Sequence, residues 1–133
     1  MTDGHSGSFG DIDPFDLPEW LGDGEVIWRP EHGVHVGALV TGELTGPTGQ
    51  TLPCDLLGVD EAYPAPVADD TARTVCHKTW RHGQVWLVER EGRLTLLVPG
   101  RDFNADKALE ALHRFAKALG AKPQRFAALL RLA

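Results

Sequence analysis

The sequence contains little cysteine and no long apolar run. Its 133 residues include two cysteines, Cys54 and Cys76, one methionine and one tyrosine. Two cysteines exclude a disulfide framework and most four-cysteine zinc sites. No apolar stretch approaches the roughly 18 residues that a membrane span needs, and the N-terminus has neither the basic start nor the apolar stretch of a secretory signal. We therefore expect a soluble, cytoplasmic protein that folds around one ordinary core.

Basic residues are nearly absent from the first half of the chain. Residues 1–70 carry 14 acids and one base, Arg29, whereas residues 71–133 carry 5 acids and 12 bases, and the whole chain has a net charge of −6. A net negative charge argues against general nucleic-acid binding, which usually comes with a basic domain. The asymmetry is compatible with a partner of one sign, with attraction between subunits, or with halves whose charges mix on one folded surface.

Residues 1–16 are rich in Gly, Asp and Ser and cannot bury much surface. We expect a flexible N-terminal tail there, and a single domain over 17–133. At the start of that domain, residues 17–21 favour one helical turn that Pro18 opens. Its Trp20 and Leu21 would dock on the body of the domain or, less commonly, on a partner.

The first half of the domain has the pattern of strands. Apolar and β-branched runs separated by Gly- and Pro-rich turns predict three of them, at 25–29, 34–44 and 50–59. The short turn at 30–33 predicts that the first two form a hairpin. Pro53 should limit the pairing of the third strand on one side.

The second half alternates helical and strand patterns. Apolar residues at helical spacing predict a helix over 69–82, capped by Asp69 or Asp70 and ended by Gly83. Two β-rich runs, 84–90 and 93–98, flank a two-residue loop and predict a hairpin. A second helix is expected over 105–119, after an Asn104 cap, and a last short helix is expected to begin at Pro123 and to carry Phe126, Leu129 and Leu130.

This order of elements favours an α+β fold, because the helices interleave with antiparallel hairpins rather than with single parallel strands. We predict an antiparallel sheet of about five strands, in the order β-β-β-α-β-β-α, with the helices packed on one face. Over residues 17–119 the order resembles that of type III secretion chaperone-like bacterial domains, including the YbjN-like proteins. The resemblance implies a domain that dimerises and binds segments of partner polypeptides. It lies in element order alone, so it carries no site residues over.

Metal and nucleophile patterns are weak. The cysteines and histidines include His32, His35, His77 and His82, but their spacings do not direct three or four ligands to one point. Cys54 precedes an acid, and Cys76 lies in mid-helix, so neither is placed for a lowered thiol pKa. We expect no catalytic residue, no metal and no cofactor.

Pairs of Trp and Arg suggest a partner surface, because both residue types are enriched at interfaces. We predict partner-binding roles for Trp28, Arg29, Trp80, Arg81 and Arg93. The leading hypothesis is a non-enzymatic interaction domain, chaperone- or adaptor-like, that forms a homodimer and binds a partner protein or peptide in a groove between sheet and helices.

A different hypothesis is a small-molecule or anion-binding domain, with enzymatic activity left open. Its site would lie near the 60–63 and 99–104 loops and would use Asp60, Tyr63, His82 and Arg101. The loop before the second helix favours an anion, since helix N-termini present free N–H groups. A solvated surface loop is the more ordinary explanation of the same residues.

Overall fold

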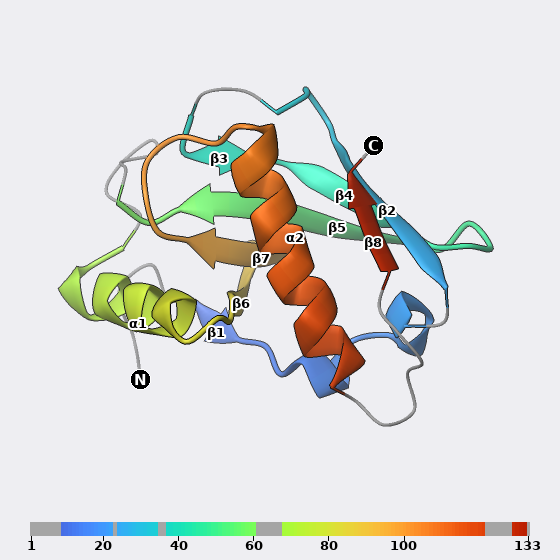
Figure 1. Cartoon of the computed structure of the whole chain (residues 1–133), viewed down its shortest axis with the longest axis horizontal. Coiled ribbons are helices and arrows are strands. Elements are labelled where there is room, and N and C mark those ends of the chain that lie inside the picture. The colour runs from blue at the N-terminus through green and yellow to red at the C-terminus, as the bar shows by residue number, and fades with distance from the viewer. Residues whose placement is uncertain (1–8, 23, 35–36, 61–67, 122–128, 133) are drawn as a thin grey trace.

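The computed structural model describes residues 9–22, 24–34, 37–60, 68–121 and 129–132 (Figure 1). It is an α+β fold with a mixed, mostly antiparallel sheet. The helices are α1 (Asp70–Arg81) and α2 (Ala105–Gly120), and the short 3-10 turns are η2 (Pro14–Asp16) and η3 (Glu19–Gly22). The strands are β1 (Gly10–Asp11), β2 (Glu25–Pro30), β3 (Leu39–Val40), β4 (Gly42–Thr45), β5 (Thr51–Gly58), β6 (Trp86–Arg90), β7 (Arg93–Val98) and β8 (Leu129–Leu132). No helix among the described residues combines the length and apolar character that crossing a bilayer requires.

The sheet contains parallel pairs that the sequence did not predict. Its strands follow the order β1-β6-β7-β5-β4-β2-β8. Strand β3 is not part of this order and pairs with β5. β5 runs parallel to β7, and β2 runs parallel to β8, whereas the other pairings between described strands are antiparallel. The arrows of β5 and β7 point the same way in Figure 1. The expected antiparallel sheet is therefore wrong at β5–β7, because α1 and β6 together return the chain to the side of β5 in the same direction.

The helices cover opposite faces of the sheet, not one face as the sequence suggested. Leu56 and Leu96 belong to the large core cluster with the buried side of α2. Their neighbours Leu57 and Leu97 belong to a second cluster with Cys76 of α1. Since successive residues of a strand point to opposite faces, α1 and α2 lie on different sides of β5 and β7.

Local signals in the second half are confirmed. The Asp69 side chain accepts a hydrogen bond from the Ala72 N–H at 2.8 Å and caps α1, and Asn104 caps α2 in the same way. At the predicted hairpin loop, Glu91 and Gly92 have φ of 55° and 77°. Positive φ at both central residues is the two-residue turn that matches the twist of paired strands, so β6 and β7 form a hairpin.

The strand predicted over 34–44 is shorter and interrupted. β3 and β4 both pair with β5, but Gly42, the first residue of β4, donates its N–H to the Asp55 carboxylate at 3.1 Å. Strand β2 pairs with β4, with Pro30 opposite Gly42. The connection between these paired strands is therefore 31–41, not the short turn expected at 30–33.

The C-terminal end of the chain also differs from prediction. Residues 129–132 form strand β8 beside β2 instead of continuing a helix, and the expected start of that helix lies outside the described residues. The apolar spacing there suits a helix, so pairing with β2 overrides the local pattern. Residues 9–16, assigned to a flexible tail from composition, lie along β6 and the end of α2. Trp20 and Leu21 pack into the core of the same chain.

Candidate functional site

The N-terminal strap, residues 9–16, covers the outer edge of β6. The Ile12 N–H donates to the Leu87 carbonyl at 3.0 Å, and Trp86 Nε1–H donates to the Asp11 carboxylate at 2.8 Å. The Phe9 ring meets the Trp86 ring edge-on, with 6.1 Å between centroids. The strap is thus tied to β6 by backbone and side chains, and it stands as a wall beside the start of that strand.

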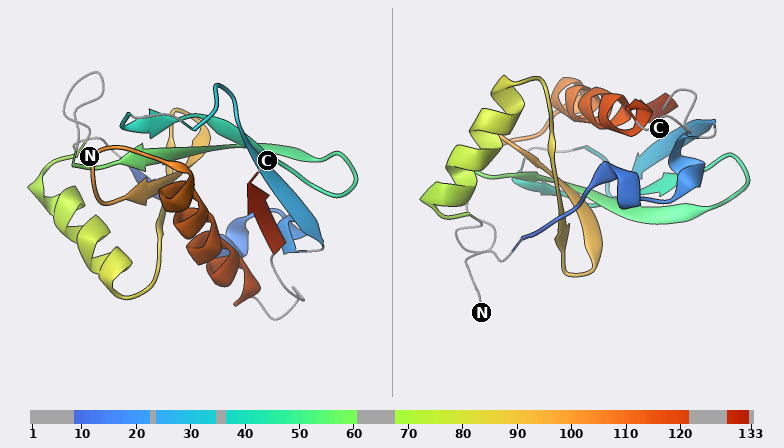
Figure 2. Two further views of the ribbon diagram at one scale, coloured as in Figure 1. Left: turned by 45° about the horizontal axis from the view of Figure 1, so that its top comes forward. Right: turned by 90° about the horizontal axis from the view of Figure 1, so that it is seen from below.

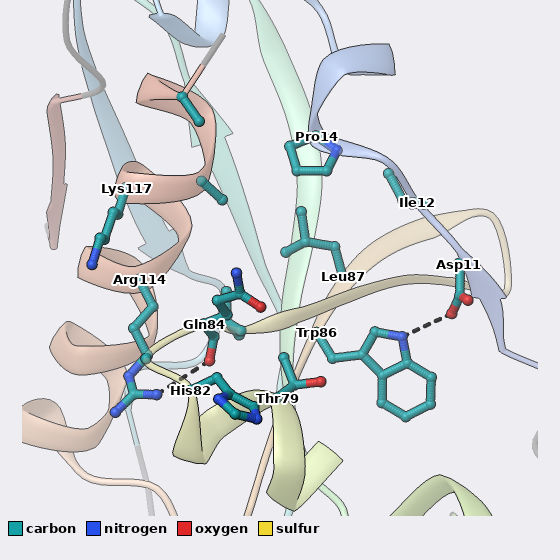
Figure 3. A pocket seen from close by; sticks show the side chains of 14 residues that line it. Asp11, Ile12, Pro14, Thr79, His82, Gln84, Trp86, Leu87, Arg114 and Lys117 are labelled. Carbon is teal, nitrogen blue, oxygen red and sulfur yellow. Dashed lines mark hydrogen bonds between the residues drawn. The ribbon is translucent and has the colours of Figure 1, made fainter. Parts of the chain in front are cut away.

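Facing this wall is an open cavity of about 520 Å³, which we call the interhelix groove. It lies between the strap, the end of α1, the start of β6 and the second half of α2 (Figure 3). Both views in Figure 2 show the chain leading from α1 into β6 between the two helices. Ile12, Val85 and Leu87 give the groove apolar surface. Segments far apart in the sequence therefore build one preformed site.

Arg114 of α2 is held rigidly at the edge of the groove. Its guanidinium donates to the Trp80 and Gln84 carbonyls and, at 2.8 Å, to the Glu110 carboxylate. It also lies over the Trp80 ring, with 3.6 Å from its central carbon to the ring centroid. A guanidinium has five N–H donors, so two remain beyond these three bonds to described residues. The side chain thus connects α2 to the end of α1 and to the segment before β6, and it keeps donor capacity.

The groove has a cationic side and an acidic side. Lys117 and His82 are exposed side chains on the same side as Arg114, and no described residue forms a hydrogen bond or ion pair with either side chain. Asp11 lies on the opposite wall, with its carboxylate directed to the Trp86 indole (Figure 3). The groove can therefore accept an anion beside α2 and an apolar group toward the strap and β6.

Asp60 forms a second polar junction, just beyond β5. Its carboxylate accepts hydrogen bonds from His77 Nε2 at 2.9 Å and from the Gly100 N–H at 2.8 Å, and Arg73 Nε lies 3.3 Å from it. Burial alone would raise the pKa of Asp60, but these hydrogen bonds and the charges of His77 and Arg73 together hold it below its usual value. The chain also approaches itself closely here, since a Cβ on Gly58 would lie 2.8 Å from the Gly100 carbonyl oxygen.

A shallow cleft of about 340 Å³ adjoins this junction along α1. Arg73, His77 and Arg81 line it at intervals of four residues, which places them on one helical face. Arg73 also pairs with Asp70 at 2.7 Å. The cleft is a surface of mixed charge on which Arg81 has no partner among the described residues.

The five predicted partner-binding residues are scattered. Trp28 is fully buried, and its indole N–H donates to the Cys54 carbonyl at 2.8 Å. Trp80 is half-buried beneath Arg114, Arg81 is exposed in the α1 cleft, and Arg29 is exposed on β2. Arg93 pairs with Asp55 inside the fold. Trp28 and Arg93 thus have structural partners, and Trp80 lies beside the interhelix groove.

The predicted ligand-binding residues fall into two places. Asp60 does meet the 99–104 loop, through the Gly100 N–H. His82 lines the interhelix groove instead, and Arg101 is exposed on the loop before α2. Tyr63 lies outside the described residues.

Both cysteines are buried. Burial, and to a smaller extent the nearby Asp60 charge, raises the pKa of Cys76 to about 12. Burial, and to a smaller extent the Asp55 charge, also raises the pKa of Cys54. Thiols in this state are poor nucleophiles. Among the described residues, no three His, Cys, Asp or Glu side chains gather as a metal site would require.

The sequence analysis missed Arg114, Lys117 and the strap residues that wall the groove. Arg114 and Lys117 are three residues apart, at the edge of the apolar stripe of α2, and this spacing does put them on one face. Nothing in the sequence indicates that this face meets the end of α1 rather than solvent. The Asp11–Trp86 contact joins segments 75 residues apart, which no local pattern encodes.

Comparison with known proteins yields no match, whether to a family model, to a curated protein or to a solved structure. The chemistry of the groove and of the Asp60 junction is therefore what bears on function.

Proposed function

We propose that this chain is a non-enzymatic binding domain, of the chaperone or adaptor kind, that takes up a segment of a partner polypeptide in the interhelix groove. The observation that carries the proposal is the groove itself, an open cavity of about 520 Å³ with apolar surface and a few placed polar groups. Cavities of roughly 300–1,000 Å³ with this lining are typical of ligand sites.

The construction of the groove supports a polypeptide ligand. Its walls come from packed elements and from the strap, which β6 holds in place, so binding requires little ordering of the site itself. An open groove admits part of a longer chain, whereas a closed cavity admits only a small molecule. The raised pKa values of both buried thiols favour binding over covalent catalysis.

The element order adds to the proposal, because over 17–119 it resembles the type III secretion chaperone-like domains. We also propose that the chain forms a homodimer, since an acidic first half and a basic second half attract each other between subunits. Sedimentation at low and high salt tests this, with a dimer expected at low salt that weakens as salt rises. A monomer at every salt concentration would contradict the dimer and leave the groove proposal standing.

Selection from a randomised peptide library tests the groove directly. We expect the full chain to enrich peptides that share a pattern, and we expect Ala118→Trp, which fills the groove from α2, to lose them. The matched control is Ala105→Trp, which adds the same side chain at an exposed position on the same helix and should bind like the unmodified chain.

A second groove variant keeps the test conclusive if Ala118→Trp fails to fold. Gln84→Trp adds bulk at an exposed position that lines the groove, where the fold is less sensitive. Enriched peptides that bind both groove variants as tightly as the control would contradict the proposal, and so would a library that yields no enriched peptide.

The Asp60 junction supports a second candidate, the binding of a small anion in the α1 cleft. The observation that favours it is the row Arg73, His77 and Arg81 on one face. A thermal-shift titration with inorganic phosphate should then raise the melting temperature, and Arg81→Gln should reduce the rise. No shift at millimolar phosphate would remove this candidate.

A further inference from the structure

We infer that the interhelix groove selects acidic, apolar polypeptide segments: a carboxylate beside Lys117 and Arg114, next to an aliphatic or aromatic side chain over Ile12 and Leu87. The inference rests on the proposed function and names the chemistry of its partner.

The charges on the groove walls favour a carboxylate. The cations Lys117 and Arg114 lie on one side together with the His82 ring, and Lys117 and His82 have no side-chain partner among the described residues. Glu110 offsets part of the Arg114 charge, and the C-terminal ends of α2 and of α1 each add about half a negative charge. The groups on this side that can bind a carboxylate directly are therefore the unpaired Lys117 ammonium and the remaining N–H donors of Arg114.

The one acid of the groove lies on the wall opposite Lys117. Asp11 is the one acid lining the groove among the described residues, and its carboxylate is directed to the Trp86 indole N–H, although it keeps its negative charge. A lysine or arginine placed beside α2 would therefore face Lys117 without a groove-lining acid on that side. Like charges placed together at an interface discriminate against the wrong partner.

The strap of the same chain already places an acid and an aliphatic residue against the surface beside the groove. Asp11 directs its carboxylate to the Trp86 N–H, and the following residue, Ile12, packs against the core and lines the groove. The surface around the start of β6 thus complements an acid followed by an aliphatic residue. A partner segment with the same pattern would continue this surface across the groove to Lys117.

The experiment reads the composition of the peptides that depend on the groove. Peptides selected from the randomised library by the full chain, and lost by Ala118→Trp, should be enriched in Asp or Glu beside large apolar residues. Synthetic versions of the strongest binder, with Asn and Gln in place of Asp and Glu, should bind about tenfold more weakly.

A charge reversal at the groove provides the matched pair. Lys117→Glu should weaken binding of the acidic peptide about tenfold or more, whereas Lys78→Glu, the same change at an exposed position of α1 outside the groove, should leave it nearly unchanged. Rising salt should weaken binding to the unmodified chain and have little effect on Lys117→Glu.

The outcomes separate the two proposals. Groove-dependent peptides that are neutral or basic, or that bind Lys117→Glu as tightly as the unmodified chain, would overturn the inference and leave the proposed function intact. A library without any groove-dependent peptide would overturn both.

Discussion

The buried carboxylate of Asp55 joins several strands of the sheet. Asp55 has no exposed surface, and it accepts two hydrogen bonds from Arg93 at 2.9 Å, one from Arg90 at 3.2 Å and one from the Gly42 N–H at 3.1 Å. It joins β5 to the β6–β7 hairpin and to the start of β4. The hydrogen bonds that Arg93 donates to Asp55, with the charge of Asp55, also raise the pKa of Arg93, which burial alone would lower.

Replacing Asp55 by Asn should therefore be costly. The change keeps the shape of the side chain but removes the negative charge between two guanidinium groups. Breaking a buried ion pair by removing one partner costs roughly 3–5 kcal/mol. The arginine side chains are 29% and 19% exposed for Arg93 and Arg90, so water can partly solvate them after the change. We expect a loss of about 3 kcal/mol of unfolding free energy, at the lower end of that range.

Urea denaturation measures this loss without the screening that a guanidinium salt adds. The control is Glu43→Gln, which removes an exposed acid from the neighbouring strand β4 and should change stability by less than about 0.5 kcal/mol. The double variant Asp55→Leu with Arg93→Met should be less destabilised than the sum of its single changes, because the two groups interact. A loss below about 1 kcal/mol for Asp55→Asn would refute the reasoning, because that is no more than an ordinary hydrogen bond contributes.

Three further predictions concern the Asp60 junction, the buried thiols and the strap. Asp60→Asn should lower the free energy of unfolding by about 1 kcal/mol at neutral pH. Because the folded-state pKa of Asp60 is depressed, the extra stability of the unmodified chain should hold above about pH 4 and disappear as pH falls through that pKa. A difference in melting temperature between the two proteins that does not change with pH would contradict this. Cys54 and Cys76 should resist a thiol reagent in the folded chain and react once urea unfolds it; rapid labelling without denaturant would show that their burial is wrong. Asp11→Ala should cost about 1 kcal/mol by leaving the Trp86 indole without its acceptor, and unchanged urea unfolding would contradict the role of this bond in holding the strap.

Local features of this fold were predictable because their causes are local. The caps of both helices and the Glu91–Gly92 turn each depend on a few neighbouring residues, and all three are confirmed. The parallel pairing of β5 and β7 depends on a long-range return of the chain. A signal for it was present, since the near-continuous apolar runs at 54–59 and 94–98 are typical of strands buried on both faces. The sequence analysis instead predicted an antiparallel sheet with the helices packed on one face.

The candidate site was less predictable than the fold. Tryptophan and arginine are enriched at interfaces, but the same residues also build cores and ion pairs, as the burial of Trp28 and the Asp55–Arg93 pair illustrate. Of the predicted site residues, His82 lines the interhelix groove. The cations of the groove, Arg114 and Lys117, belong to an ordinary helical surface until α1 and the strap are packed beside them.

The most direct test of the central claim is to follow the backbone amide signals of the full chain by NMR while a groove-selected peptide is added. We predict saturable shifts for residues that line the groove, such as Gly83, Gln84 and Ala118, with no change at the distant β4–β5 turn around Gly49. Shifts centred on that turn or on the α1 cleft, with the groove signals unmoved, would show that the interhelix groove is not the binding site.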